Sequence, residues 1–434
     1  MAGAAEAQRP AFNASPESEI VRVLATAALA LFVLRCWAGP PTLWTALDVS
    51  CPADAMSPET DACRLLQVNG DVLRSGGLDR LAVPLPLRDR VATRTLPVLR
   101  TLYLRQTAST NDEAVWIGKV DGDSFSNVTL APTPTGVVGL ISTSAGPVYR
   151  IRQILAGKTI VELVSRAEFV DDTHENQFVA SATPMSLKAG CAVPQPVEID
   201  VLPVYTGKAK EWAQGEAQIA AWMTVAQRLA NQSFAGSGVQ QRIRVAPARQ
   251  VSYEESGNNE KDLARLRLGE AKWAQDIRRW RKEVDVDLVI LVTSNVERGG
   301  HAEALNSANL ENIRPFAEIA FAVVPIQSLT SSYAFVHELG HLMGAGHTDD
   351  PQTSGYSVAY RQLEPEGPCG PWTTIMDGDA LSSAYARLLY WSNTAKELRV
   401  CGRPMGRQDR ADNARTLNET AARVASFSCW MRDQ

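Results

Sequence analysis

The interpretation of this 434-residue chain depends on the stretch Val336-His337-Glu338-Leu339-Gly340-His341-Leu342-Met343-Gly344-Ala345-Gly346-His347. This stretch contains three of the chain's five histidines. On a helix, His337 and His341 lie one turn apart, so their imidazoles project from one face and can reach a single metal ion. Gly344 permits a sharp left-handed turn of the backbone that brings His347 round as a third ligand. The pattern therefore predicts a metal centre with three imidazole ligands.

Three neutral imidazoles leave a fourth coordination position open, which is typical of catalytic zinc, whereas structural zinc is closed by four protein ligands. We therefore expect one Zn²⁺ as cofactor. Zinc lowers the pKa of a bound water from about 16 towards about 7. Glu338 would accept the proton of this water as general base and later return it to the leaving amine. Peptide-bond hydrolysis is the expected reaction, although hydrolysis of a non-peptide amide would use the same metal chemistry.

The run from His337 to His347 matches the extended zinc signature of the metzincin peptidases, and its surroundings most resemble the bacterial reprolysin-like (adamalysin-type) branch. Downstream, Thr373-Thr374-Ile375-Met376 resembles the Met-turn of that clan, which implies that Met376 lies beneath the metal. The segments 390–393 and 411–418 resemble the closing segments of the same peptidases. The zinc signature and the Met-turn are the specific parts of this resemblance.

The chain departs from the adamalysin pattern at two positions. Thr348 stands where Asp usually follows the third histidine, and Asp349 comes one residue later. Gly378, not a tyrosine, stands two residues after Met376, so the additional tyrosine ligand of some branches is not expected.

The resemblance implies an α+β or α/β fold for residues 197–434, with a twisted, mostly parallel sheet, an antiparallel edge strand, two long helices and the active-site helix. The residue pattern independently favours a β-α-β-α-β order in this part of the chain. The predicted elements are strand 198–205, a helix around 219–230, strand 242–245, helix 262–284 and strand 288–292.

Residues 40–196 are expected to form a β-rich, propeptide-like domain. Glycine-separated apolar runs have the spacing of antiparallel hairpins. These runs are 102–104, 115–117, 128–130, 137–141, 148–154 and 159–163. The segments 116–118 and 148–151 are similar to the propeptides that accompany reprolysin-like peptidases. His174 is expected to be a surface or core residue, not a ligand.

The composition excludes several classes of protein. With 45% hydrophobic and 21% charged residues the chain is neither disordered nor a polytopic membrane protein. It carries 43 Lys and Arg against 48 Asp and Glu, a net charge of −5, without a long basic tract. A nucleic-acid partner is therefore not expected.

Residues 1–39 are predicted to be an N-terminal targeting segment, which we call the address segment. The apolar run 23–34 has the length of a signal-peptide core and is short of the roughly 20 residues of a spanning helix. A cleaved signal with a secreted or periplasmic product is favoured, and an uncleaved membrane anchor over residues 20–37 or a buried helix are the alternatives.

The chain has seven cysteines, and loss of Cys36 with the signal would leave six, an even set that suits an exported disulfide-bonded protein. Cys51 and Cys63 are close enough in sequence to pair locally. Cys191 stands in the joint between the two expected domains. An ordinary disulfide is favoured there over a latency switch, in which its thiolate would occupy the open position of the zinc.

Protein or peptide substrates are expected to bind in extended form along an edge strand between Gly299 and Val324. His301 lies in this segment and is expected to have a loop or strand role. The alternative function is a catalytically silent module that binds metal or a protein partner, motivated by Thr348 and Asp377. A Ca²⁺ site at Asp349, Asp350, Asp377 and Asp379 is conceivable but not claimed.

Overall fold

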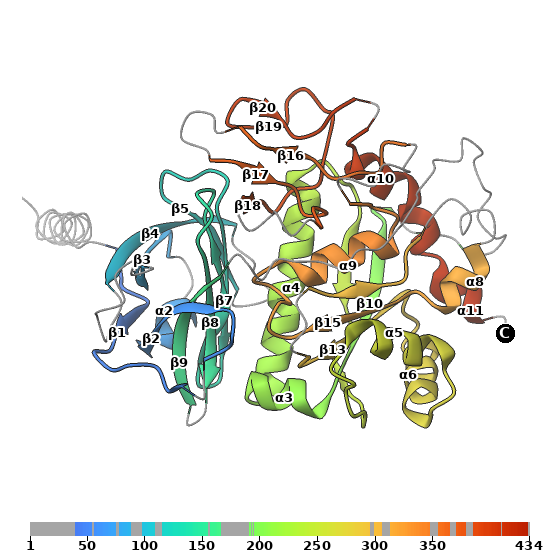
Figure 1. Cartoon of the computed structure of the whole chain (residues 1–434), viewed down its shortest axis with the longest axis horizontal. Helices are drawn as coiled ribbons and strands as arrows, with labels where there is room; N and C mark the ends of the chain where they lie inside the picture. Colours follow the sequence, from blue (N-terminus) through green and yellow to red (C-terminus); the bar gives the residue numbers. More distant parts are fainter. Residues whose placement is uncertain are drawn as a thin grey trace, which may run out of the picture. The chain divides into compact units, whose positions relative to one another are not determined.

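The computed structural model describes residues 40–432, apart from 54–55, 75–77, 88–97, 109–114, 155–156, 166–190, 192, 194, 296–298, 306–312, 348–354, 365–369, 379–384 and 409. Residues Thr42–Gln434 fold as one unit with mixed α and β structure (Figure 1). The proposed address segment 1–39, Cys36 and His174 lie outside the described residues. The domain boundaries 1–39, 40–196 and 197–434 stay a prediction.

The described N-terminal strands form one nine-stranded antiparallel sheet in the order β1-β2-β9-β8-β7-β6-β5-β4-β3, which we call the N-terminal sheet. The six predicted strands of this region are confirmed as β4 to β9. The elements are β1 (Trp44–Ala46), β2 (Thr60–Val68), α2 (Gly70–Arg74), β3 (Arg80–Pro86), β4 (Leu99–Ala108), β5 (Trp116–Val120), β6 (Asn127–Thr133), β7 (Gly136–Ser142), β8 (Val148–Ile154) and β9 (Lys158–Val164).

The two edges of the N-terminal sheet meet, because Thr42 forms a bridge with Ala82 of β3 and the Leu43 amide donates to the Ala82 carbonyl. One face of the sheet thus encloses its own apolar core, to which Trp44, Leu104 and Ile151 contribute. A closed edge removes unpaired backbone groups that would otherwise invite pairing with another chain.

The second large sheet, the C-terminal sheet, has the order β11-β10-β13-β15-β14, with β12 also paired to β10. All its pairs are parallel except that of the edge strand β14 with β15. The strands of this sheet and the helices between them are β10 (Glu198–Tyr205), α3 (Gly207–Ala213), α4 (Glu216–Gly236), β11 (Arg242–Val245), β12 (Arg249–Gln250), α5 (Asn259–Leu268), α6 (Lys272–Glu283), β13 (Leu288–Thr293), β14 (His301–Ala302), α8 (Ile313–Glu318) and β15 (Phe321–Pro325), followed by α9 (Ala334–Leu342).

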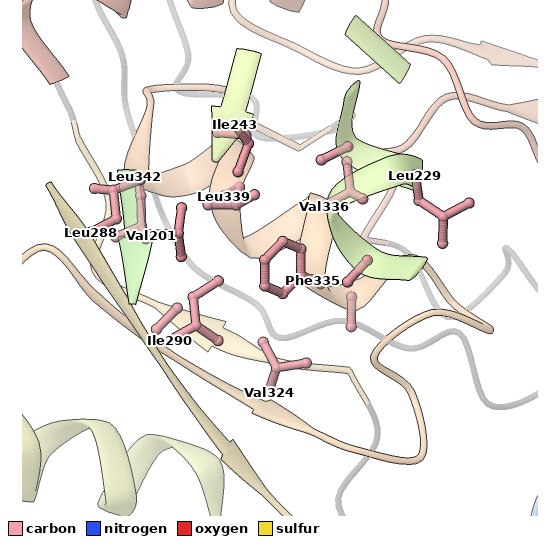
Figure 2. Close-up of a cluster of buried hydrophobic side chains, with 14 of the residues drawn as sticks. Val201, Leu229, Ile243, Leu288, Ile290, Val324, Phe335, Val336, Leu339 and Leu342 are labelled. Carbon is pink, nitrogen blue, oxygen red and sulfur yellow. The ribbon is translucent and has the colours of Figure 1, made fainter. Parts of the chain in front are cut away.

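Helices cover both faces of the C-terminal sheet, which explains its continuous apolar strands. Val201, Ile290 and Val324 point to one face, where they pack with α4 and α9, as Figure 2 shows. The alternate residues, such as Leu202 and Leu291, point to the other face and pack with α5 and α6. The position of helix α9 is therefore fixed by the sheet against which it packs.

The predicted single helix 262–284 is wrong, because this segment forms two helices, α5 and α6. Gly269 has a φ of +69° and ends α5. The Arg278 guanidinium then donates to the Arg267 and Leu266 carbonyls at the exposed end of α5. Satisfying these terminal carbonyls stabilises the break that the glycine permits.

The C-terminal part consists of a small three-stranded sheet in the order β16-β17-β18, a two-stranded sheet of β19 and β20, and two helices, α10 and α11. They are β16 (Arg361–Gln362), β17 (Trp372–Thr373), β18 (Ala386–Arg387), β19 (Arg399–Val400), β20 (Arg403–Pro404), α10 (Asn413–Val424) and α11 (Phe427–Arg432). Each helix in the described part of the chain is too short or too polar to cross a lipid bilayer.

Two disulfides test the predictions made for Cys51, Cys63 and Cys191. The predicted bond between Cys51 and Cys63 is confirmed. Cys191 is bonded to Cys429 of α11, with Cα atoms 5.9 Å apart. The latency switch at Cys191 is therefore wrong, because a sulfur in a disulfide has no thiolate to offer a metal, and the ordinary disulfide is confirmed.

Candidate metal centre

Helix α9 begins at Ala334, after Tyr333, which has a left-handed φ of 61°, and it ends at Leu342. One face carries Val336, Leu339 and other apolar residues into the core (Figure 2). Gly344 has a φ of +95°, so the predicted left-handed turn after the helix is confirmed. The chain then reverses and brings His347 back towards the helix.

The structure brings the three predicted ligands together. His337 Nε2 lies 3.1 Å from His341 Nε2 and 3.0 Å from His347 Nε2, and the last pair is 3.0 Å apart. Zn–N bonds of about 2.0–2.1 Å place two ligand nitrogens of a tetrahedral ion about 3.3 Å apart. The three nitrogens therefore have the spacing of ligands that share one small divalent ion.

The protonation of His337 also fits a metal ligand. Its Nδ1 lies 3.0 Å from the carbonyl oxygen of Ile375, so Nδ1–H donates there and the Nε2 lone pair faces the other two imidazoles. Burial, followed by the neighbouring His341 and His347, lowers the pKa of His337 well below its usual value. The imidazole is thus held neutral, as metal binding requires.

Glu338 is fully buried beside the cluster, and Gly300 explains how it is accommodated. A Cβ added to Gly300 would lie 2.5 Å from both Cγ and Oε1 of Glu338. The backbone that leads into the edge strand β14 therefore passes directly against this carboxylate. Sequence reasoning did not identify Gly300, although it placed the substrate-binding segment after Gly299.

Met376 is fully buried and packs against the inner side of α9. Its Sδ would lie 2.6 Å from a Cβ added to Gly340, so only glycine permits this approach at that helix position. Two residues later, a Cβ on Gly378 would lie 2.9 Å from the His347 ring. The segment 376–378 thus forms a wall of the centre, which we call the Met-turn wall.

Two arginines contact Asp377 in the Met-turn wall. Arg361 forms an ion pair with the Asp377 carboxylate, and Arg387 donates to the Asp377 carbonyl. Arg387 also donates to the Ser332 carbonyl at 3.1 Å, before the start of α9. Neither arginine was recognised from the sequence, since each joins the site only through the tertiary fold.

The other candidate residues lie as follows. His301 belongs to the edge strand β14, as the strand alternative expected. Thr348, Asp349, Asp350 and Asp379 lie outside the described residues, so the unclaimed calcium site is left with Asp377, which is paired with Arg361. Within the described part of the chain, the group able to hold a metal is His337, His341 and His347.

Comparison with known proteins identifies the class. Residues 197–391 match metallo-peptidase family M12. Together with the curated relatives described next, this match shows that the chain belongs to family M12 and is a reprolysin-like metallopeptidase, a hydrolase of peptide bonds.

The chain is similar to three bacterial enzymes named peptidyl-Asp metalloendopeptidase. It is 31% identical to that of Stenotrophomonas maltophilia (strain R551-3) over 70% of this chain and 71% of the relative. It is 30% identical to that of Xanthomonas campestris pv. campestris over 70% of each chain. A second S. maltophilia enzyme, from strain K279a, is 31% identical over 78% of this chain and 79% of the relative.

Among solved structures, one titled "Structure of a chaperone-substrate complex" is similar at a TM-score of 0.40 and 17% identity, over 53% of this chain and 35% of that chain.

Proposed function

We propose that this protein is an exported, zinc-dependent endopeptidase with a metzincin-type catalytic domain over residues 197–434, made as a precursor. The observation that carries the proposal is the convergence of three histidine Nε2 atoms within 3.0–3.1 Å, beside the buried Glu338. In this proposal His337, His341 and His347 hold the metal, Glu338 is the catalytic base, and Met376 is the structural methionine of the Met-turn.

In the proposed hydrolysis each residue of the site has a separate role. His337, His341 and His347 would hold a zinc ion, which would supply the Lewis acidity that makes water a nucleophile near neutral pH. Glu338 accepts a proton from the attacking water and returns it to the leaving amine. Ile375, through its carbonyl, keeps the His337 ring oriented with Nε2 towards the metal position.

Substrate binding would use the edge strand of the C-terminal sheet. β14 pairs antiparallel with β15, and His301 and Ala302 pair with Val323 and Ala322. The segment that leads into β14 runs past Glu338 at Gly300. An extended peptide added along this edge would place its backbone next to the base, which supports backbone-directed binding of many sequences.

Export is supported by the disulfides, because such bonds persist in oxidising compartments. Residues 1–39 would then be a signal peptide, with an uncleaved anchor over residues 20–37 as the alternative. The product would be secreted or periplasmic, and its partners would be protein or peptide substrates, not nucleic acid.

We also propose that cleavage occurs at bonds to aspartate. The support is the name of the relatives, peptidyl-Asp metalloendopeptidase, and a cation at the site. Arg387 contacts the Met-turn wall and is close enough to His337 to contribute to lowering the pKa of that imidazole. A positive potential beside the metal favours a substrate carboxylate.

The experiment uses the purified full chain with denatured casein and an internally quenched peptide containing one Asp. We expect hydrolysis that 1,10-phenanthroline abolishes and that stoichiometric Zn²⁺ restores. Glu338→Gln should bind zinc but lose at least about a thousandfold in kcat, whereas the exposed Glu260→Gln should match the unmodified protein. Chelator-insensitive hydrolysis, or full activity of Glu338→Gln, would reject the mechanism.

The catalytically silent binding module is not favoured, because the curated relatives are named as metalloendopeptidases. The same experiment separates the two functions. A zinc-loaded protein that hydrolyses neither substrate would support the silent module.

A further inference from the structure

Asp377 directly follows the methionine of the Met-turn, and each polar group of this residue is bonded. Its amide donates to the Thr374 carbonyl at 3.2 Å, which closes the turn. Its carbonyl oxygen accepts from Arg387, and its two carboxylate oxygens accept from Arg361. These contacts fix both the backbone and the side chain of Asp377, and the bidentate contact with Arg361 adds geometric specificity.

The two arginines come from one row of the small sheet β16-β17-β18. Arg361 of β16 pairs with Thr373 of β17, and Thr373 pairs with Arg387 of β18. Residues opposite each other on neighbouring strands project from the same face, so both guanidinium groups can reach the turn that follows β17. Two cations on one buried face repel each other where water does not screen them. The carboxylate of Asp377 supplies the counter-charge.

The Met-turn wall and the residue before it contact two of the three candidate metal ligands. The Ile375 carbonyl oxygen lies 3.0 Å from His337 Nδ1. Gly378 lies so close to the His347 ring that an added Cβ would be 2.9 Å from it. Asp377 stands between these two contacts in the chain. A shift of Asp377 would therefore disturb the orientation of both imidazoles.

Arg387 extends the same set of contacts to the start of α9. It donates to the Ser332 carbonyl at 3.1 Å as well as to the Asp377 carbonyl. In Figure 1 the small sheet β16-β17-β18 lies beside α9, as this contact requires. One guanidinium group thus ties the Met-turn wall to the segment that leads into the helix with the first two histidines.

The two partners of the Arg361–Asp377 ion pair are unequally buried. The side chain of Asp377 is 0% exposed and that of Arg361 is 12% exposed. A long, partly exposed guanidinium side chain can turn towards water when its partner is removed, whereas a fully buried carboxylate cannot. Loss of the Arg361 charge should therefore disturb the wall more than loss of the Asp377 charge.

From these contacts we propose that Arg361 and Asp377 form a lock of the Met-turn wall, which we call the Met-turn lock. The two residues act as positioning residues for His337 and His347, because they hold the wall in the place where the three imidazoles converge. The inference rests on the proposed function in that these histidines hold the metal. An acidic residue after Met376 is thereby compatible with a working metal centre.

Zinc affinity of the full chain, measured by competition with a chromophoric chelator, tests the Met-turn lock without any hydrolysis. Arg361→Gln should weaken zinc binding about 10- to 100-fold, the range typical for loss of contacts that orient metal ligands. Asp377→Asn, which keeps the shape and removes the charge, should weaken it about threefold. Unchanged affinity in Arg361→Gln would overturn the proposal. If Arg361→Gln does not fold, Asp377→Asn decides, and an affinity equal to that of the unmodified protein would overturn it.

The double variant Arg361→Gln/Asp377→Asn tests whether the two residues act as one unit. It should bind zinc about as tightly as Asp377→Asn alone, because a neutral amide no longer needs a buried cation beside it. The effects of the two single substitutions are then not additive. Additive losses of affinity would show that the residues act separately and would overturn the lock.

Arg152→Gln is the matched control for a general loss of stability. It removes a guanidinium group from the Arg152–Glu162 ion pair of the N-terminal sheet, whose side chains are 5% and 0% exposed. This substitution should lower the free energy of unfolding in urea and leave zinc affinity unchanged. If it weakened zinc binding as much as Arg361→Gln, the effect of Arg361→Gln would be one of general stability and the lock would be overturned.

The outcomes separate this inference from the proposed function. If the affinities follow the expectation but no peptide is hydrolysed, the proposed function fails and the Met-turn lock stands. If the unmodified protein binds no zinc, amide hydrogen exchange of the metal-free protein decides instead. The Asp377 amide should then exchange at least about tenfold faster in Arg361→Gln than in Arg152→Gln, because its bond to the Thr374 carbonyl opens more readily. Equal exchange rates would overturn the lock.

Discussion

The side-chain amide of Asn413 forms two hydrogen bonds with the backbone of Gly346, the residue before His347. Gly346 N–H donates to Asn413 Oδ1, and Asn413 Nδ2 donates to the Gly346 carbonyl, both at 3.2 Å. Asn413 is fully buried at the start of α10. Because α9 ends at Leu342, its helical hydrogen bonds do not reach this segment, and the two Asn413 bonds fix the backbone next to His347, the third candidate ligand.

Asn413→Ala should therefore weaken zinc binding about 10- to 100-fold, the range typical for loss of a contact that orients a ligand. His337 and His341 keep their helical positions, so some affinity remains. Competition with a chromophoric chelator measures the affinity. Asn418→Ala is the matched control, because Asn418 lies in the same helix and bonds the exposed Gln240 and Gly238 backbone. Equal affinities in the two variants would contradict this role.

Gly300→Ala should separate catalysis from metal binding. The new methyl group would overlap the Glu338 carboxylate, which is the movable end of a side chain, so the fold is expected to survive while the base is displaced. A displacement near 1 Å costs about a hundredfold in rate. We expect kcat to fall by about this factor with zinc content unchanged. Gly207→Ala, where a Cβ meets nothing within 4 Å, is the control.

The convergence of the three candidate metal ligands could be predicted from sequence because the interactions that position these histidines are local. One helical turn joins His337 to His341, and one left-handed glycine brings back His347. Strands β10, β11 and β13 could be predicted for the same reason, since β11 shows alternation of apolar residues and β13 a continuous apolar run. Strand β2 was missed because Arg64, a buried charge, interrupts its apolar pattern.

The residues that support the site could not be predicted, because each depends on a distant partner. Asn413 meets Gly346 across 67 positions, and Arg387 meets Ser332 across 55. No periodicity marks such pairs in a single sequence. The break at Gly269 was missed for a related reason: the helical pattern continues through it, and the Arg278 contacts that stabilise the break are tertiary.

Cys191→Ser should lower stability and should not activate the protein prematurely. The disulfide with Cys429 closes a loop of 238 positions, and the chain-entropy relation gives a loss of about 5 kcal/mol as an upper value. Urea unfolding with and without the substitution measures the change. If the Cys191→Ser protein were more active without processing, Cys191 would act as a latency switch, contrary to the observed disulfide with Cys429.

Acid should destabilise the buried ion pairs of Glu162 in β9. Burial acts to raise the pKa of this carboxyl, but Arg150 and Arg152 outweigh it and lower the pKa to about 2. A depressed folded-state pKa stabilises the protein above pH 4.5, the ordinary value, and this contribution is lost as the pH falls towards 2. The difference between the ordinary and the lowered pKa of Glu162 corresponds to about 3 kcal/mol of folding stability. Glu162→Gln should be less stable at pH 7, and its unfolding free energy should change less between pH 5 and 2.5.

Arg387→Gln should reduce the preference for aspartate if its charge contributes to substrate selection. The side chain is buried against the Met-turn wall and the turn before α9, so the substitution also removes hydrogen bonds and lowers overall activity. The informative quantity is thus the ratio of kcat/KM for two peptides that differ only in Asp or Asn, in which general damage cancels. Because a neutral amide keeps the shape of the carboxylate but not its charge, we expect this ratio to fall about tenfold. Arg399→Gln, at an exposed position of β19, should leave the ratio unchanged. A preference that persists in Arg387→Gln would mean that aspartate is selected by other groups.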